Sequence, residues 1–235
     1  MRGTPKTQTK ATKPATKAAK PRVSKVKPAK LVAKPKNKFH HGSLPAALKS
    51  AALQLLQEGG AQAVSLREAT RRVGVTHTAT YRHFDSREAL LAAVAGDGFE
   101  AMAEELSARS VGAGNGLLRL AAVGLGYVEF ARKNPALFRL MFGPELQPQR
   151  RHPSANAPAR AAAELLRSLV VDGQAEGVIQ PSDPTAVALT SWALAHGLAV
   201  LILDGQIPER SDVVQFAADT LYNALSTTVG TTPVH

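Results

Sequence analysis

The segment that most constrains the fold is Ser65–Leu91, which reads SLREATRRVGVTHTATYRHFDSREALL. Its opening, from Ser65 to Glu68, is a Ser-x-x-Glu capping box, and this pattern predicts the start of a helix. Gly74 predicts the end of that helix, because glycine readily adopts the left-handed conformation of a helix C-cap. Thr76 is the expected N-cap of a second short helix, so the segment predicts two helices joined by a tight turn.

The second of these helices, from 76 to about 83, is predicted to expose hydrogen-bonding side chains. His77, Thr78 and Tyr81 occupy its outer face, and Arg82 is a further candidate. Such side chains suit base edges and phosphate oxygens, and a single helix fits the major groove of DNA. A helical hairpin with a solvated polar face is the plainer interpretation, but a Tyr-Arg-His-Phe run after a glycine turn makes it the less favoured one.

A third helix is expected to begin at Asp85 or Ser86 and to run through Val94. The Gly-Asp-Gly run at 96–98 then predicts an interruption, because glycine is a poor helix former. The helical pattern resumes at Phe99.

This part of the chain resembles the DNA-binding domain of TetR/AcrR-type transcriptional repressors. The similarity rests on GVTHTATYRHF and DSREALLAAV, and upstream on FHHGSL and AALQLLQEGG. The upstream opening resembles one subgroup whose C-terminal domain carries a Trp…His-Gly signature, and this chain has Trp192, His196 and Gly197. The resemblance covers about 39–228 and is strongest over 43–95.

The resemblance implies which residues bind DNA. His77 and Thr78 would face base edges. Ser65 and Arg67 would lie near the phosphate backbone, and Tyr81, His83 and Arg87 would contact phosphates. Thr76 would cap the helix that carries His77 and Thr78. Thr70 stands where the family usually has alanine, and Thr80 stands where Leu or Pro is common, so both departures bear on how the two helices cross. The expected DNA-binding residues are Ser65, Arg67, Thr76, His77, Thr78, Tyr81, His83 and Arg87.

The basic charge of the chain is concentrated in one tail. Residues 1–38 contain eleven Lys and two Arg and no acidic residue, whereas the remainder has 16 basic and 18 acidic residues. The tail has almost no large apolar side chain to offset chain entropy, and we expect it to be disordered. It is interpreted foremost as a basic arm that adds phosphate contacts; a solvated extension of little effect and a transit peptide are the alternatives.

Beyond residue 95 the pattern is helical and strand patterns are essentially absent, so the chain is predicted to be all-α. Ala186–Leu203 is apolar almost all round, which predicts burial on more than one side. It is either a central core helix or, as the resemblance favours, part of a four-helix dimer interface. The expected parts are a basic tail over 1–38, a three-helix helix-turn-helix domain over 39–95 with its motif at about 65–84, and an effector-binding and dimerisation domain over 96–235.

The resemblance also implies a cavity for a small-molecule effector in the C-terminal domain. Plain core packing is the alternative interpretation and, residue by residue, the favoured one. Trp192 and His196 share one helix face, and a structural role for them is favoured over effector contact. The apolar character of the set suggests a hydrophobic or aromatic effector. The candidate residues are Phe99, Met102, Tyr127, Phe138, Met141, Trp192 and His196.

Motifs for other functions are missing from the sequence. There is no cysteine, no phosphate-binding glycine loop, no metal-ligand cluster and no convincing nucleophile–base pair, so we expect no enzyme, cofactor or metal. No run is expected to supply the ~20 apolar residues of a membrane span. The leading interpretation is a cytoplasmic, nucleoid-associated homodimer that binds a palindromic operator and is released by an effector. The alternative is an architectural nucleoid-type protein dominated by its basic tail.

Overall fold

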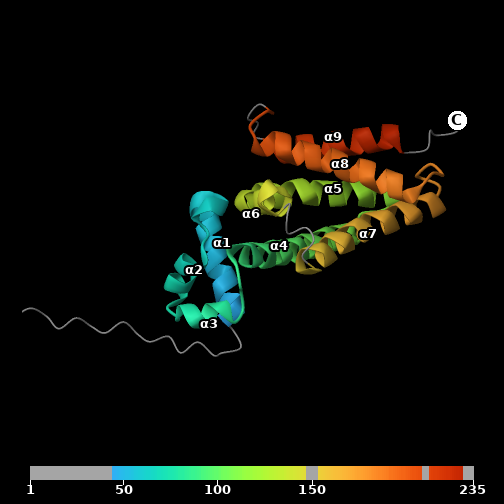
Figure 1. The fold of residues 1–235 in the computed structure, drawn as a ribbon. Coiled ribbons are helices and arrows are strands. Elements are labelled where there is room, and N and C mark those ends of the chain that lie inside the picture. The colour runs from blue at the N-terminus through green and yellow to red at the C-terminus, as the bar shows by residue number, and fades with distance from the viewer. Residues whose placement is uncertain (1–43, 147–152, 208–211, 230–235) are drawn as a thin grey trace, which may run out of the picture. The chain divides into compact units, whose positions relative to one another are not determined.

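The protein is all-α in the part that the computed structural model describes, which is residues 44–146, 153–207 and 212–229, with backbone only over 153–159. The predicted basic tail lies outside these residues. No β-sheet occurs in the three described ranges (Figure 1). The elements are α1 (Leu44–Ala63), α2 (Leu66–Val73), α3 (His77–Tyr81), α4 (Arg87–Ser110), α5 (Gly116–Lys133), α6 (Pro135–Phe142), the 3-10 turn η2 (Pro144–Leu146), α7 (Pro153–Ala175), α8 (Pro184–Leu203) and α9 (Val213–Thr228).

The start and end of α2 follow from its capping residues, as predicted. The Ser65 hydroxyl accepts a hydrogen bond from the Glu68 backbone N–H at 3.1 Å. Gly74 has φ of 75°, and its N–H donates to the Thr70 carbonyl, which ends the helix. These two local signals fix the length of α2 before any tertiary contact is considered.

Capping also sets the boundaries of the next two helices. The Thr76 hydroxyl accepts from the Ala79 N–H at 3.4 Å, and α3 ends at Tyr81, slightly before the predicted end. Of the two predicted caps for the following helix, Ser86 is the one that acts, since its hydroxyl accepts from the Ala89 N–H at 3.0 Å.

The predicted interruption at 96–98 is wrong, because α4 runs unbroken from Arg87 to Ser110. Gly98 lies within this helix where α6 approaches it closely. A Cβ atom at Gly98 would lie 2.8 Å from the Met141 sulfur and 3.0 Å from a Leu137 methyl carbon. The glycine therefore accommodates a neighbouring helix rather than ending its own, and this need is invisible in local sequence.

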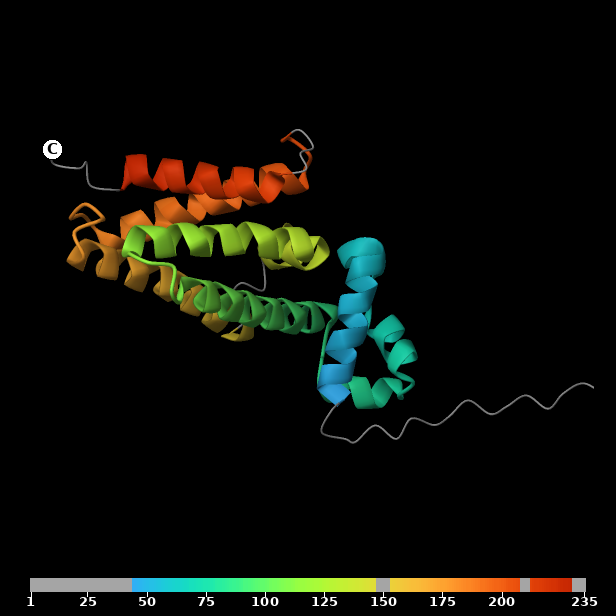
Figure 2. The ribbon, with the colours of Figure 1, turned by 180° about the vertical axis from the view of Figure 1, so that it is seen from behind.

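The helix α5 occupies the centre of the C-terminal helices, in contact with α4, α6, α7, α8 and α9 (Figure 2). Val123, Tyr127 and Val128 are buried on it. One hydrophobic cluster continues from α1 through α4 and α6 to α9, so the helices before and after residue 95 share a core. A smaller cluster around Leu120 and Ile179 closes the far end.

The helix α8 is apolar on its exposed side as well as on its buried side. This helix has 20 residues and contains an 18-residue stretch with a mean hydropathy of 1.9, which makes it long and apolar enough to cross a membrane, so the expectation that no such run exists is wrong. A core helix of a soluble protein meets the same criterion of length and composition. Ala195 and Ala199 face inward, whereas Leu189 and Leu201 are 58% and 46% exposed. The predicted burial of α8 on more than one side is therefore not found within the single chain.

Candidate functional site

The helix α3 presents three polar side chains outward and is attached by its inner face. His77 and Thr78 are exposed, Tyr81 is 50% exposed, and the His77 and Tyr81 ring centroids lie 5.2 Å apart. Thr80 is the buried residue of this helix, and Ala79 beside it is half-buried. The predicted base-reading residues His77 and Thr78 thus share one solvent-facing surface with Tyr81, which was predicted to contact phosphate.

The two threonines that depart from the family pattern meet each other between α2 and α3. Their hydroxyl oxygens lie 2.8 Å apart, and Thr70 and Thr80 are only 4% and 0% exposed. Thr70 also lies 2.6 Å from the Leu66 carbonyl oxygen. Each departure is visible in the sequence by itself, but the pairing of the two threonines depends on how the helices cross.

The hydroxyl groups that cap α2 and α3 lie at the edges of this surface. Ser65 and Thr76 each accept a backbone N–H, so each hydroxyl keeps a proton that it can donate to a phosphate oxygen. His83 is exposed just beyond the end of α3.

The arginines around α2 and α3 divide into paired and unpaired groups. Arg71 forms two hydrogen bonds with Glu68, and this contact lowers the pKa of the Glu68 carboxyl to about 2. Arg72 is paired with Glu58. Arg67 and Arg82 are exposed, and their guanidinium groups make no hydrogen bond or ion pair with any described residue. Arg82, a further candidate from the sequence, therefore carries an unpaired guanidinium, as Arg67 does.

Arg87 is placed differently from the other predicted DNA-binding residues. Its guanidinium donates to the Val64 carbonyl at 2.9 Å and to the Ala61 carbonyl at 2.6 Å, and it lies 3.7 Å from the Glu88 carboxylate. These bonds connect the start of α4 to the end of α1. The side chain is thus engaged inside the protein.

The predicted effector residues gather in an aromatic cluster between α5, α6 and α8. Tyr127 and Phe138 meet edge to face with centroids 5.5 Å apart, and Phe142 lies 4.9 Å from the His196 ring. Phe99, Met102 and Met141 are also buried nearby in the same hydrophobic cluster.

A polar contact crosses this apolar cluster. The Tyr127 hydroxyl lies 2.8 Å from Nδ1 of His196 and accepts a hydrogen bond from the Trp192 indole N–H at 3.3 Å. Burial raises the pKa of the Tyr127 phenol above its ordinary value, and burial likewise lowers the pKa of His196. Both side chains are therefore held neutral near pH 7.

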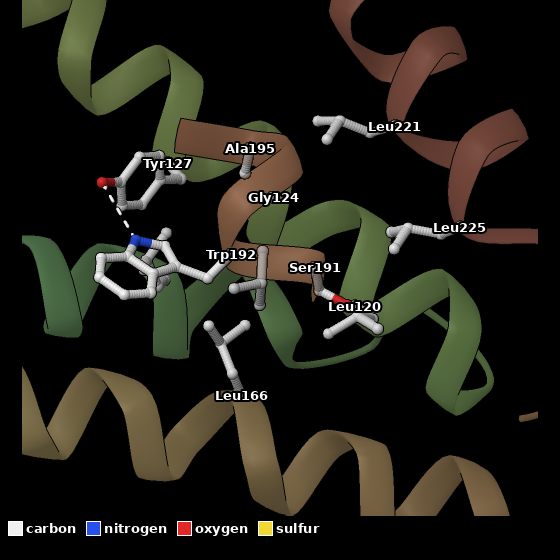
Figure 3. A pocket seen from close by; sticks show the side chains of 11 residues that line it. Leu120, Gly124, Tyr127, Leu166, Ser191, Trp192, Ala195, Leu221 and Leu225 are labelled. Atoms are coloured by element: carbon white, nitrogen blue, oxygen red, sulfur yellow. Dashed lines mark hydrogen bonds between the residues drawn. The ribbon is translucent and has the colours of Figure 1, made fainter. Parts of the chain in front are cut away.

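A small cavity adjoins the cluster, with room for about one water molecule (Figure 3). Tyr127 and Trp192 lie on one side of it, and Leu221 and Leu225 of α9 lie on the other. Of the predicted effector residues, only these two line the cavity, because the others are engaged in packing around it. The remaining lining residues are Leu106, Leu120, Val123, Gly124, Leu166, Ser191 and Ala195.

A short exposed helix held behind a glycine turn on a helical body defines the class of helix-turn-helix proteins. Two family models match the chain: bacterial regulatory proteins of the tetR family over residues 48–94, and the tetracyclin repressor-like C-terminal domain over residues 120–224. The chain belongs to the TetR family of bacterial transcriptional regulators.

Solved structures give the same fold. A protein with unknown function from Rhodococcus sp. RHA1 is 31% identical, with a TM-score of 0.69 over 80% of this chain and 98% of that chain. A transcriptional regulator of the TetR/AcrR family from Thermobifida fusca YX-ER1 is 25% identical, with a TM-score of 0.60 over 76% of this chain and 96% of that one. A tetR-family regulatory protein from Rhodococcus RHA1, 21% identical with a TM-score of 0.60, shares the fold over 80% and 98% of the two chains. No curated protein matches the chain.

Proposed function

We propose that this TetR-family DNA-binding regulator is a homodimeric, sequence-specific repressor that a small apolar molecule releases from its operator. The observation that carries the proposal is the surface of α3, where His77, Thr78 and Tyr81 point outward. A helix with such side chains on one face is suited to read base edges in the major groove.

The remaining contacts of this surface are assigned to phosphates. Arg67 and Arg82 carry unpaired charges, and Ser65, Thr76, Tyr81 and His83 supply hydrogen-bond donors around them. Phosphate contacts of this kind set the register of a protein on DNA, whereas the base contacts set its preference. Arg87 is assigned to holding α4 against α1, since carbonyl groups already occupy its guanidinium.

Dimerisation is assigned to the outer faces of α8 and α9. Leu189 and Leu201 on α8 and Val214 and Tyr222 on α9 are exposed, and the two helices contact each other along the chain's surface. A second copy would cover this apolar face, and two-fold symmetry would match two DNA half-sites. We assign DNA binding to residues 39–95 and effector binding and dimerisation to residues 96–235, with α4 continuous across the boundary between them.

Effector binding is assigned to the cavity and to the cluster beside it. Because the cavity is small, an effector must open it by moving Trp192 or the helices around it. Such a ligand shifts the protein toward the opened conformation only if it binds that conformation more tightly. A cytoplasmic location beside the nucleoid is consistent with this function.

Selection of bound sequences from a random DNA pool tests the proposal. We expect a palindromic motif to be enriched, and its absence contradicts sequence-specific binding by a dimer.

The basic tail is assigned to accessory phosphate binding. Deleting residues 1–38 should leave the selected motif unchanged and reduce the dependence of affinity on salt, because fewer counterions are released. The regulator fold does not favour the alternative of an architectural protein dominated by its tail. That alternative predicts that the full-length protein, with its tail, has negligible preference among DNA sequences.

A further inference from the structure

The attachment of α3 to the rest of the protein combines the packing of the half-buried Ala79 on the core with a polar contact at Thr80. This helix has five residues, and Thr80 is the one that is buried. Apolar helices are normally held by several side chains packed on a core, and such packing tolerates small rotations. A hydrogen bond instead requires both a short distance and a near-linear angle, so it restricts the rotation of the helix more strictly.

The direction of the hydrogen bonds follows from the chemistry of the groups. A carbonyl oxygen only accepts, so Thr70 donates its proton to the Leu66 carbonyl. Because a hydroxyl has one proton, the bond between the two threonines is donated by Thr80. The result is a run of two hydrogen bonds, from Thr80 on α3 to Thr70 and from Thr70 to the Leu66 carbonyl of α2, in which both threonine hydroxyl protons have an acceptor.

We propose that this bond fixes the rotation of α3 about its axis and makes Thr80 a specificity-determining residue that does not touch DNA. Thr80 is fully buried, whereas His77, Thr78 and Tyr81 are exposed on the same short helix. Successive helix residues are separated by about 100°, so a modest rotation of α3 changes which of these side chains reaches a given base edge. This inference rests on the proposed sequence-specific binding.

The competing interpretation is that the pair contributes only to stability. A stability role predicts that any folded variant selects the same DNA motif as the wild type. A positioning role predicts a changed motif or a loss of discrimination in a protein that remains folded. The preference among DNA sequences therefore separates the two.

Thr80→Val is the decisive variant. It keeps the shape of the side chain and removes the donor, while Thr70 keeps its bond to Leu66, so no buried hydroxyl is left without a partner. Binding is measured by fluorescence anisotropy to the duplex that the wild type selects and to a duplex of random sequence. We expect about tenfold weaker binding to the selected duplex, as for one lost hydrogen bond or base contact, and little change for the random duplex.

Two variants serve as controls. Thr80→Ser keeps the hydroxyl and should restore the wild-type preference. Ser168→Ala removes a hydroxyl that donates to the Leu165 carbonyl within α7, outside the helices assigned to DNA binding and dimerisation, and should leave the preference unchanged. Thermal unfolding of each variant establishes that it is folded.

The outcomes decide between the interpretations. A folded Thr80→Val protein that selects the wild-type motif with wild-type affinity overturns the inference. If Thr80→Val does not fold, the double variant Thr70→Ala with Thr80→Val, which has no buried hydroxyl at either position, is put through the same selection and judged in the same way. If the wild type itself enriches no motif, the proposed function fails, and this result does not depend on any Thr80 variant.

Discussion

The Tyr127 hydroxyl on α5 lies 2.8 Å from Nδ1 of His196 on α8. The same oxygen accepts a hydrogen bond from the Trp192 indole N–H at 3.3 Å. One oxygen atom thus joins two helices through the residues of the Trp…His-Gly signature.

Replacing Tyr127 by phenylalanine should destabilise the protein. The change leaves the Trp192 N–H and His196 Nδ1 without their partner in a largely apolar cluster, which costs about 1–3 kcal/mol. Denaturant unfolding at about pH 7.5 measures the loss. Tyr81→Phe, which removes an exposed hydroxyl, is the matched control and should change stability by less than about 0.5 kcal/mol. Equal effects of the two changes contradict a structural role for the Tyr127 contact.

The stability of the protein should decrease as the pH falls below about 6.5, the ordinary pKa of histidine. Burial lowers the pKa of His196 in the folded state, so the unfolded chain binds a proton at a higher pH than the folded protein does. The stabilisation is complete above the unfolded pKa and is lost as the pH falls through the folded pKa.

Urea unfolding from about pH 8 to about pH 5 checks this dependence on His196. The His196→Gln variant cannot titrate at this position and should show a shallower decrease than the wild type. Parallel curves for the two proteins assign the pH dependence to other groups.

Arg67 and Arg82 should each contribute one ionic contact to DNA. Replacing either by alanine should weaken binding to all sequences alike and reduce the slope of log affinity against log salt by about 1. Arg71→Ala is the control, since this arginine is already paired with Glu68, and its effect on the slope should be smaller. The assignment to phosphates is refuted if Arg71→Ala matches the other two variants.

Arg87→Ala should affect folding rather than the salt dependence of DNA binding. The change leaves the Ala61 and Val64 carbonyls without their charged donor, which costs about 1–3 kcal/mol in unfolding free energy. Arg87→Lys keeps the charge but not the paired donors and should recover only part of this stability. A stable Arg87→Ala protein with a reduced salt slope assigns the guanidinium to phosphate instead.

Features set by adjacent residues were predictable from the sequence. The caps at Ser65 and Gly74 depend on their own backbone neighbours, and both act as expected. Gly98 was misjudged because its role depends on α6, which lies about forty residues away. Thr70 and Thr80 were recognisable as unusual, but their hydrogen bond depends on the crossing of two helices.

The effector residues show a different limit of sequence analysis. Aromatic and Met side chains with helical spacing have the same pattern whether they line a cavity or fill it. The structure brings the predicted set together, yet Tyr127 and Trp192 alone among them border the cavity. The hydrogen bonds from Arg87 to the end of α1 were likewise not predictable from the sequence, because they depend on where the start of α4 lies relative to backbone carbonyls more than twenty residues earlier.

The continuity of α4 has a mechanical consequence. Its 24 residues form one rod of about 36 Å, from Arg87, which holds the end of α1, to the residues beside the cavity. Because no hinge divides the rod, it behaves as a lever, and a tilt of about 5° at one end displaces the other by about 3 Å. Under the proposed effector response, a tilt of α4 that begins near Leu106 beside the cavity would therefore move Arg87 and the end of α1 that it holds.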